Sequence, residues 1–173
     1  GVAVLAAPDK YTAEAGFPDG SLVRLLHLLR GRFPYLVVDA GPSLGPAANL
    51  LFNVADAVYL VTQAEIPSLR NAQRMLLHFQ SAGVASGRLE VVVNRHDARR
   101  TAIQVGQIER ALGVQLRWKV PNDFYNVRRS LDEGAPLALG NSPVSRVVRQ
   151  MAREACGKPA TPPSNKKWLN LFQ

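Results

Sequence analysis

The chain has 173 residues, of which 47% are hydrophobic and 20% are charged, and its formal net charge is +8. This composition and length are typical of one ordinary globular domain. No apolar run approaches the ~20 residues that span a bilayer, and the single cysteine, Cys156, excludes an internal disulfide framework and a multi-cysteine metal site. The first residues lack the basic region of a signal peptide, so a cytoplasmic location is expected.

Short apolar runs alternate with amphipathic stretches along the chain, which predicts strands separated by helices. Strands are expected at 2–6, 35–39, 57–62, 89–94 and 116–120, and helices at 21–29, 47–55, 67–82, 101–112, 126–133 and 142–155. Strands joined by crossover helices pair in parallel, and helices then cover both faces of the sheet. The predicted fold is therefore α/β, a three-layer, doubly wound and mainly parallel sheet.

Polar residues follow four of these predicted strands. Asp39 and Gly41 lie at the end of the second strand, and Thr62 and Gln63 at the end of the third. Asn94 ends the fourth strand, and Asp123 comes shortly after the fifth. In open parallel sheets, ligands bind beyond the carboxyl ends of the strands. The sequence therefore predicts a ligand site at that edge of the sheet.

In order and spacing, these strand ends resemble the MinD/ParA family of P-loop ATPases over residues 2–155. Residues 35–39 (Tyr-Leu-Val-Val-Asp) resemble the family's Walker B-like strand and the start of switch II, and residues 67–72 (Pro-Ser-Leu-Arg-Asn-Ala) resemble the opening of the next helix. Residues 91–95 (Val-Val-Val-Asn-Arg) resemble the strand that ends beside the adenine. Residues 120–123 (Val-Pro-Asn-Asp), with 130–137, resemble the last strand and base-side loop. Residues 120–123 and 5–8 are most similar to the CpaE (TadZ-like) branch, which helps to place Flp-type pilus machinery.

A P-loop is absent from these 173 residues. The motif requires G-x-x-x-x-G-K-[ST], and the one Gly-Lys pair, Gly157-Lys158, has Ala152 in place of the first glycine and Pro159 in place of the hydroxyl residue. The resemblance implies that the P-loop unit lies upstream of Gly1. Residues 1–157 would then be the C-terminal portion of the ATPase domain, followed by a linker and short tail at 158–173. A degenerate member that binds no nucleotide is the alternative.

The resemblance gives Asp39 and Gly41 roles in catalysis. Asp39 would hold a water on the Mg²⁺ that bridges the phosphates of ATP, and Gly41 would donate its backbone N–H to the γ-phosphate. Ordinary turn residues are the alternative. Gly41 precedes Pro42, whereas the family's order is Asp-x-Pro-x-Gly, and Ser43 stands at the fifth place. Hydrolysis therefore does not follow from the resemblance alone.

The resemblance also implies a set of residues around the base. Asn94 would read the adenine edge, because its amide offers both a donor and an acceptor. A strand-closing asparagine, N-cap roles for Asn122 or Asp123, and a solvated basic loop with Arg99 and Arg100 are the alternatives. The base-binding candidates are Asn94, Arg95, Pro121, Asn122 and Asp123.

The end of the sequence resembles the short amphipathic anchor of MinD-like proteins. Its lysines would meet anionic headgroups while its large apolar residues enter the interface. So short a helix is marginal and would need dimerisation or a second contact. Packing on its own domain or on a partner is the alternative. The anchor candidates are Lys166, Lys167, Trp168, Leu169, Leu171 and Phe172.

Together, these features imply a nucleotide-switched positioning protein that uses ATP and Mg²⁺. An ATP-bridged homodimer would recruit pilus- or secretion-assembly proteins at the inner membrane or cell pole. Two alternatives stay open: a scaffold without ATP turnover, and a ParA-like DNA partner, for which the net charge is the one supporting feature.

Overall fold

The computed structural model describes residues 2–6, 20–42, 44–97, 99 and 102–157. The chain divides into two compact units, Gly1–Leu51 and Phe52–Gln173, called here the first and second units. Each is described by itself. The linker and anchor expected at 158–173 lie outside the described residues, so the anchor and the boundary at residue 157 stay predictions.

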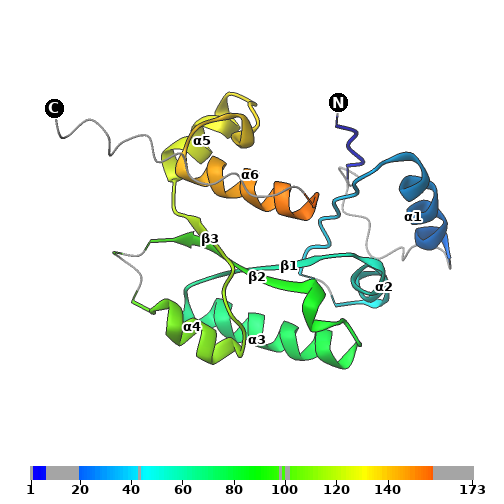
Figure 1. Cartoon of the computed structure of the whole chain (residues 1–173), viewed down its shortest axis with the longest axis horizontal. Helices are drawn as coiled ribbons and strands as arrows, with labels where there is room; N and C mark the ends of the chain where they lie inside the picture. Colours follow the sequence, from blue (N-terminus) through cyan, green and yellow to red (C-terminus); the bar gives the residue numbers. More distant parts are fainter. Residues whose placement is uncertain (1, 7–19, 43, 98, 100–101, 158–173) are drawn as a thin grey trace. The chain divides into compact units, whose positions relative to one another are not determined.

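Three parallel strands form the sheet of the second unit (Figure 1). Their order is β1 (Val58–Gln63), β2 (Leu89–His96) and β3 (Trp118–Pro121). The β1–β2 register runs from Val58 opposite Leu89 to Gln63 opposite Asn94. In the described part of the chain β1 is an outer strand of this sheet, and its Val61 is 58% exposed. The parallel α/β fold predicted from the apolar runs is confirmed.

Helices lie on both faces of this sheet (Figure 1). On one face, α3 (Ile66–Ser81) connects β1 to β2 and α4 (Val105–Leu112) connects β2 to β3. On the other face, α6 (Pro143–Ala155) packs along β3, after the short helix α5 (Phe124–Asp132). The three layers follow from the strands, whose successive side chains point to opposite faces.

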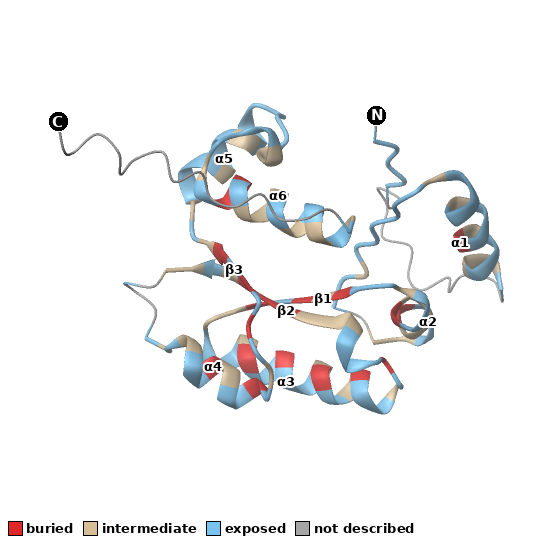
Figure 2. Ribbon diagram, viewed as in Figure 1, coloured by how far each residue is buried: buried red, intermediate tan, exposed pale blue. Residues whose placement is uncertain are grey.

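The core fills both spaces between sheet and helices (Figure 2). On the α6 side, Val92 and Trp118 form a buried cluster with Val144 of α6. Phe79 of α3 and Ile108 of α4 are 1% and 0% exposed, so the α3–α4 layer is equally well packed. Burial of apolar area on both faces is the main stabilising contribution to this unit.

Local signals determine where the helices begin and end. Gln104 and Gln107 form a reciprocal capping box at the start of α4, and Gly113 ends α4 in the left-handed region with φ 68. Ser142 caps α6 by accepting a hydrogen bond from the Ser145 N–H at 3.1 Å. The predicted helix at 101–112 therefore begins later than expected, after the cap at Gln104.

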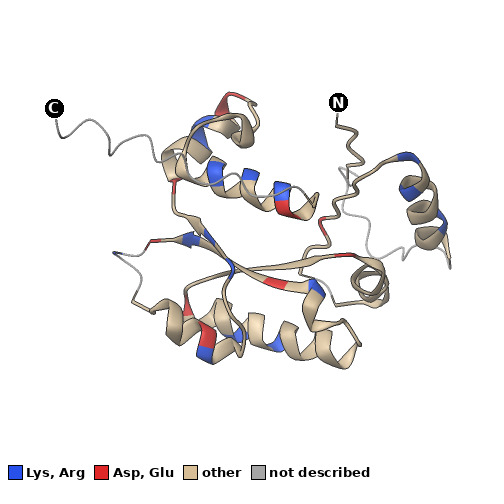
Figure 3. Ribbon diagram, viewed as in Figure 1, with Lys and Arg blue, Asp and Glu red and all other residues tan. Residues whose placement is uncertain are grey.

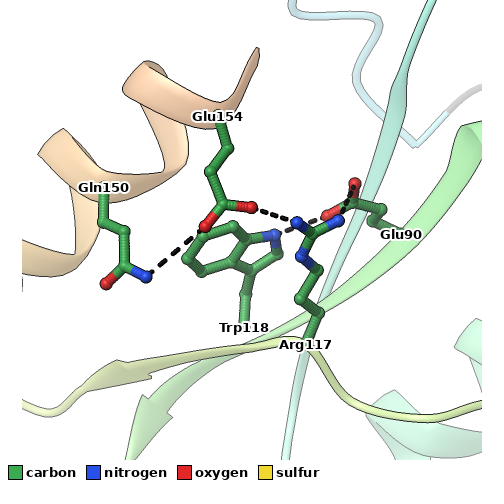
Figure 4. Close-up of polar contacts among 5 residues, drawn as sticks. All are labelled: Glu90, Arg117, Trp118, Gln150 and Glu154. Carbon is green, nitrogen blue, oxygen red and sulfur yellow. Dashed lines mark hydrogen bonds and ion pairs between the residues drawn. The ribbon is translucent and has the colours of Figure 1, made fainter. Parts of the chain in front are cut away.

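A polar network at the amino ends of β2 and β3 fastens α6 to the sheet (Figure 4). The guanidinium of Arg117 pairs with the carboxylates of Glu90, at 3.3 Å, and Glu154 near the end of α6. The indole Nε1 of Trp118 donates to Glu90, and the Gln150 amide donates to Glu154 at 3.4 Å. The network therefore joins two strands and one helix through a single cation.

Two predicted strands are wrong: residues 2–6 and 35–39 form no strand in the structure. Their apolar side chains are largely exposed, and Val37 is 94% exposed. Apolar and β-branched composition gives only a preference, whereas a strand also needs a neighbouring backbone with which to pair. The described helices that include first-unit residues are α1 (Ser21–Arg32), which begins after Gly20 rather than with Ser21 as its cap, and α2 (Pro46–Val54).

Candidate functional site

The carboxyl end of β2 contains a β-bulge. Val93 pairs with Lys119 and His96 pairs with Pro121, so β2 has one residue more than β3 over this stretch. Arg95 has φ 52, in the left-handed region that non-glycine residues rarely adopt. The Asn94 Oδ1 accepts a hydrogen bond from the Arg95 N–H at 2.9 Å. Bulges reorient side chains and are frequent beside functional sites.

The loop after β3 is joined to this bulge. The Asn122 N–H donates to the carbonyl oxygen of His96 at 3.1 Å. The structure thus brings Asn94 and Arg95 to the same edge of the sheet as residues 121–123. All five base-binding candidates lie in the second unit, at the carboxyl ends of neighbouring parallel strands.

Asp123 offers an unsatisfied acceptor at this edge. Its Oδ1 accepts from the Asn126 amide at 2.8 Å, but its Oδ2 is buried and has no hydrogen-bond partner among the described residues. A buried carboxylate oxygen without a donor is costly, about 1–3 kcal/mol. A ligand with an N–H or O–H group would satisfy it.

A pocket of about 180 Å³ lies beside the candidates, and Asn94 lines it. Hydroxyl and amide side chains also line it, from the end of β1 and the first turns of α3. Sequence reasoning noted the polar end of the third predicted strand but gave these residues no role. Ser68 and Asn71 are three apart on α3 and so share one helix face, which is the signal that could have found them. The additional polar lining residues are Thr62, Gln63, Ser68 and Asn71.

Asp39 and Gly41 belong to the first unit. The Asp39 Oδ1 accepts a hydrogen bond from the Gly41 N–H at 3.1 Å, and Gly41 has φ 61. This is an exposed aspartate-stabilised turn. Among the residues that the structure describes, no group of three or more His, Cys, Asp or Glu side chains could hold a metal ion. The roles of Asp39 and Gly41 toward Mg²⁺ and phosphate stay predictions.

The structure is an α/β domain with a parallel sheet covered on both faces, and its polar side chains lie at the carboxyl edge, where sheets of this kind bind ligands. Sequence comparison with known proteins shows which α/β proteins this chain is similar to. The chain is 23% identical over 131 residues to the septum site-determining protein MinD of Thermotoga maritima, covering 73% of this chain and 48% of that protein. It is 25% identical over 138 residues to an uncharacterized ATP-binding protein of Methanocaldococcus jannaschii, covering 79% and 51%. The chain thus spans about half the length of these curated relatives, and no protein-family model matches it.

Solved structures agree with the sequence matches. A ParA family ATPase from Chlorobium tepidum superposes with a TM-score of 0.67 at 24% identity, covering 74% of this chain and 54% of that one. MinD from Pyrococcus horikoshii, complexed with Mg-ADP, gives 0.63 at 21% identity, covering 77% and 54%. The MinC:MinD complex of Aquifex aeolicus gives 0.66 at 23% identity, covering 82% and 59%. The chain has the fold of the MinD/ParA P-loop NTPases, and with the sequence matches this supports homology to that family of ATPases.

The described residues contain no helix with the length and apolar sequence needed to cross a membrane.

Proposed function

We propose that this chain is the base-binding part of a nucleotide-dependent ATPase of the MinD/ParA type. The observation that carries the proposal is that a hydrogen-bond donor and a hydrogen-bond acceptor lie together at the carboxyl ends of β2 and β3. Because the Asn94 Oδ1 accepts a hydrogen bond from the Arg95 N–H, the amide Nδ2 remains as a donor. The buried Oδ2 of Asp123 is an acceptor that has no partner among the described residues. An adenine edge offers the complement, a ring-nitrogen acceptor beside an amino donor.

In this proposal Pro121 and Asn122 would flank the base, and the bulge at Arg95 sets the direction of the Asn94 side chain. For the first unit the proposal keeps the roles that the resemblance implies: Asp39 would hold a water on Mg²⁺, and Gly41 would contact the γ-phosphate. The P-loop motif, which would bind the remaining phosphate oxygens, is not among these 173 residues. The ion and phosphates would supply the charge that a switch loop recognises.

The cellular role that we propose is positioning and assembly. An ATP-bridged homodimer would recruit pilus- or secretion-assembly partners, as a CpaE-like protein, at the inner membrane or cell pole. Support for a partner-binding role comes from the Aquifex aeolicus relative, whose structure is a MinC:MinD complex. The tail at 166–172, with Lys166 and Trp168, would provide membrane contact.

A scaffold without ATP turnover is the second candidate. One sequence feature favours it: Gly41 stands before Pro42 in the turn after Asp39, unlike the Asp-x-Pro-x-Gly order. A scaffold of this kind would keep the fold and its partner surfaces without hydrolysing ATP.

Calorimetric titration with Mg-ATP tests the proposal, on this chain and on a form extended upstream through the expected P-loop. We expect Asn94→Ala to weaken ATP binding by the extended form about tenfold, which corresponds to about 1.4 kcal/mol. Asn53→Ala, a matched change on the α2 helix, should leave the affinity unchanged. Absence of binding by both forms would overturn the nucleotide proposal and leave the scaffold. Equal affinity for GTP would overturn the assignment of Asn94 and Asp123 to adenine.

A further inference from the structure

The groove between α3 and α4 contains a second pocket, of about 310 Å³. None of its lining residues also lines the pocket beside Asn94. This volume is at the lower end for ligand pockets, which suits one or two side chains better than a whole cofactor. The apolar part of the lining includes Ile66, Leu69, Ile103 and Ala111.

Unpaired cations border this pocket. Arg70 is one of the lining residues, and Arg74 lies one turn further along α3 on the same face. In the described part of the chain neither guanidinium has a hydrogen bond or ion pair with another side chain. The sequence of α3 contains no Asp or Glu, and the helix carries basic but no acidic segments in Figure 3. The edge of the pocket is therefore positive and uncompensated.

The groove is formed without a ligand. The Gln73 amide donates to the carbonyl oxygen of Ala111 at 3.2 Å, which fixes α3 against α4. The Glu109 carboxylate of α4 already accepts a hydrogen bond, from the Leu116 N–H to its Oε1 at 2.9 Å. Among the described residues, no acidic side chain lines the pocket. A preformed groove binds its partner with little ordering cost.

We propose that the α3–α4 groove docks a partner peptide in which one large apolar side chain is flanked by Asp or Glu. The apolar side chain enters the pocket, and the carboxylates pair with Arg70 and Arg74. Arginine suits this contact because its planar fork donates two parallel hydrogen bonds to a carboxylate. The groove and the pocket beside Asn94 share no lining residue, so a peptide and a nucleotide would not compete for the same side chains.

The apolar pocket decides between a peptide and other anionic partners. Nucleic acid bound through its phosphates would use the arginines and leave the pocket without a role. A bilayer accepts apolar residues that project from a protein surface, whereas this site is concave. A peptide uses both the cavity and the charge.

Fluorescence polarisation without nucleotide tests the proposal on the full chain. The labelled probes are a short peptide with one Phe between glutamates, the same peptide with Ser for Phe, and the same peptide with Lys for each Glu. We expect only the first to bind, and Arg70→Glu to weaken it about tenfold or more. Ala102→Trp, at the exposed edge of the pocket, should block binding without changing the charge. Arg146→Glu, an exposed change on α6, is the matched control.

The proposal would be overturned if the Phe peptide did not bind a chain that circular dichroism shows to be folded, or if the Ser peptide bound as tightly as the Phe peptide. It would also be overturned if Arg146→Glu weakened binding as much as Arg70→Glu, or if Ala102→Trp left binding unchanged. Duplex DNA and phosphatidylglycerol vesicles are titrated in parallel. If either binds in an Arg70-dependent manner while the Phe peptide does not, the arginines serve a phosphate surface instead.

Discussion

The indole Nε1 of Trp118 donates a hydrogen bond to the carboxylate of Glu90, with 2.5 Å between nitrogen and oxygen. The two residues lie on neighbouring strands, and Trp118 is only 4% exposed. A buried indole N–H that loses its acceptor leaves its desolvation uncompensated. This bond therefore matters more to stability than the ion pair drawn beside it in Figure 4.

We expect Glu90→Ala to lower the free energy of unfolding by about 2 kcal/mol, because it orphans the indole N–H. Glu90→Gln keeps an acceptor and should cost less. Arg117→Ala should cost less than about 1 kcal/mol, because the Arg117 side chain is 58% exposed. Urea unfolding measures all three, and a larger loss for Arg117→Ala than for Glu90→Ala would contradict this ranking.

Tyr59 should titrate at higher pH than an exposed tyrosine. Burial, and then the negative charge of Glu90, raise the pKa of Tyr59 above its ordinary value of 10.0, while Arg117 opposes the shift. The raised pKa means that the folded state holds the phenolic proton more tightly than the unfolded state. Its contribution to stability is therefore complete below pH 10 and is lost as pH rises through the folded-state pKa.

The ultraviolet absorbance of the phenolate measures this titration, with Tyr59→Phe identifying the signal. Glu90→Gln should lower the Tyr59 pKa by removing a negative charge. Titration of Tyr59 below its ordinary pKa of 10.0 would show that the nearby positive charge outweighs burial.

Backbone strain at Arg95 should be measurable. With φ 52, an alanine at this position keeps the unfavourable backbone and a glycine does not. Arg95→Gly should therefore be more stable than Arg95→Ala by about 1 kcal/mol. Chemical denaturation of the pair tests this, and the comparison removes the contribution of the arginine side chain. Equal stabilities would mean that the bulge relaxes when the arginine is lost.

The cap of α6 should account for a modest share of the stability. The Ser142 Oγ accepts from the Ser145 N–H and contacts the buried Ser145 hydroxyl at 2.7 Å. Ser142→Ala should cost about 1 kcal/mol, and Ser142→Asp, which keeps an acceptor, should recover most of it. Thermal unfolding measures both. A full loss in the aspartate variant would assign the cost to the hydroxyl pair rather than to the cap.

The sequence was sufficient for the elements of the second unit. β1, β2 and β3 begin and end within about two residues of the predicted strands, because compact apolar runs between turn signals have few other folds. The run at 35–39 contains consecutive valines as β2 does, but composition does not supply a pairing partner. Whether residues 35–39 form a strand depends on tertiary contacts, and the hydrophobic periodicity of the sequence gives no information about these contacts.

The site was predictable only at the level of strand ends. The pattern of polar residues after parallel strands predicted Asn94 and Asp123 at one edge of the sheet, and both lie there in the structure; their role stays a prediction. The bulge at Arg95 depends on the register of β2 against β3. The unsatisfied oxygen of Asp123 depends on how far that atom is buried. Local sequence patterns encode neither the register nor the burial. Ser68 and Asn71 were missed because they lie on a helix rather than at a strand end.

The outer position of β1 has a consequence for handling the protein. Among the described residues no strand pairs with the second side of β1, and Val61 is exposed, so this edge is a template for strand addition by another chain. At high concentration we expect the chain to aggregate through this edge. Lysine at position 61 would place a charge where an incoming strand must lie, and it should raise solubility while leaving the buried face of β1 intact.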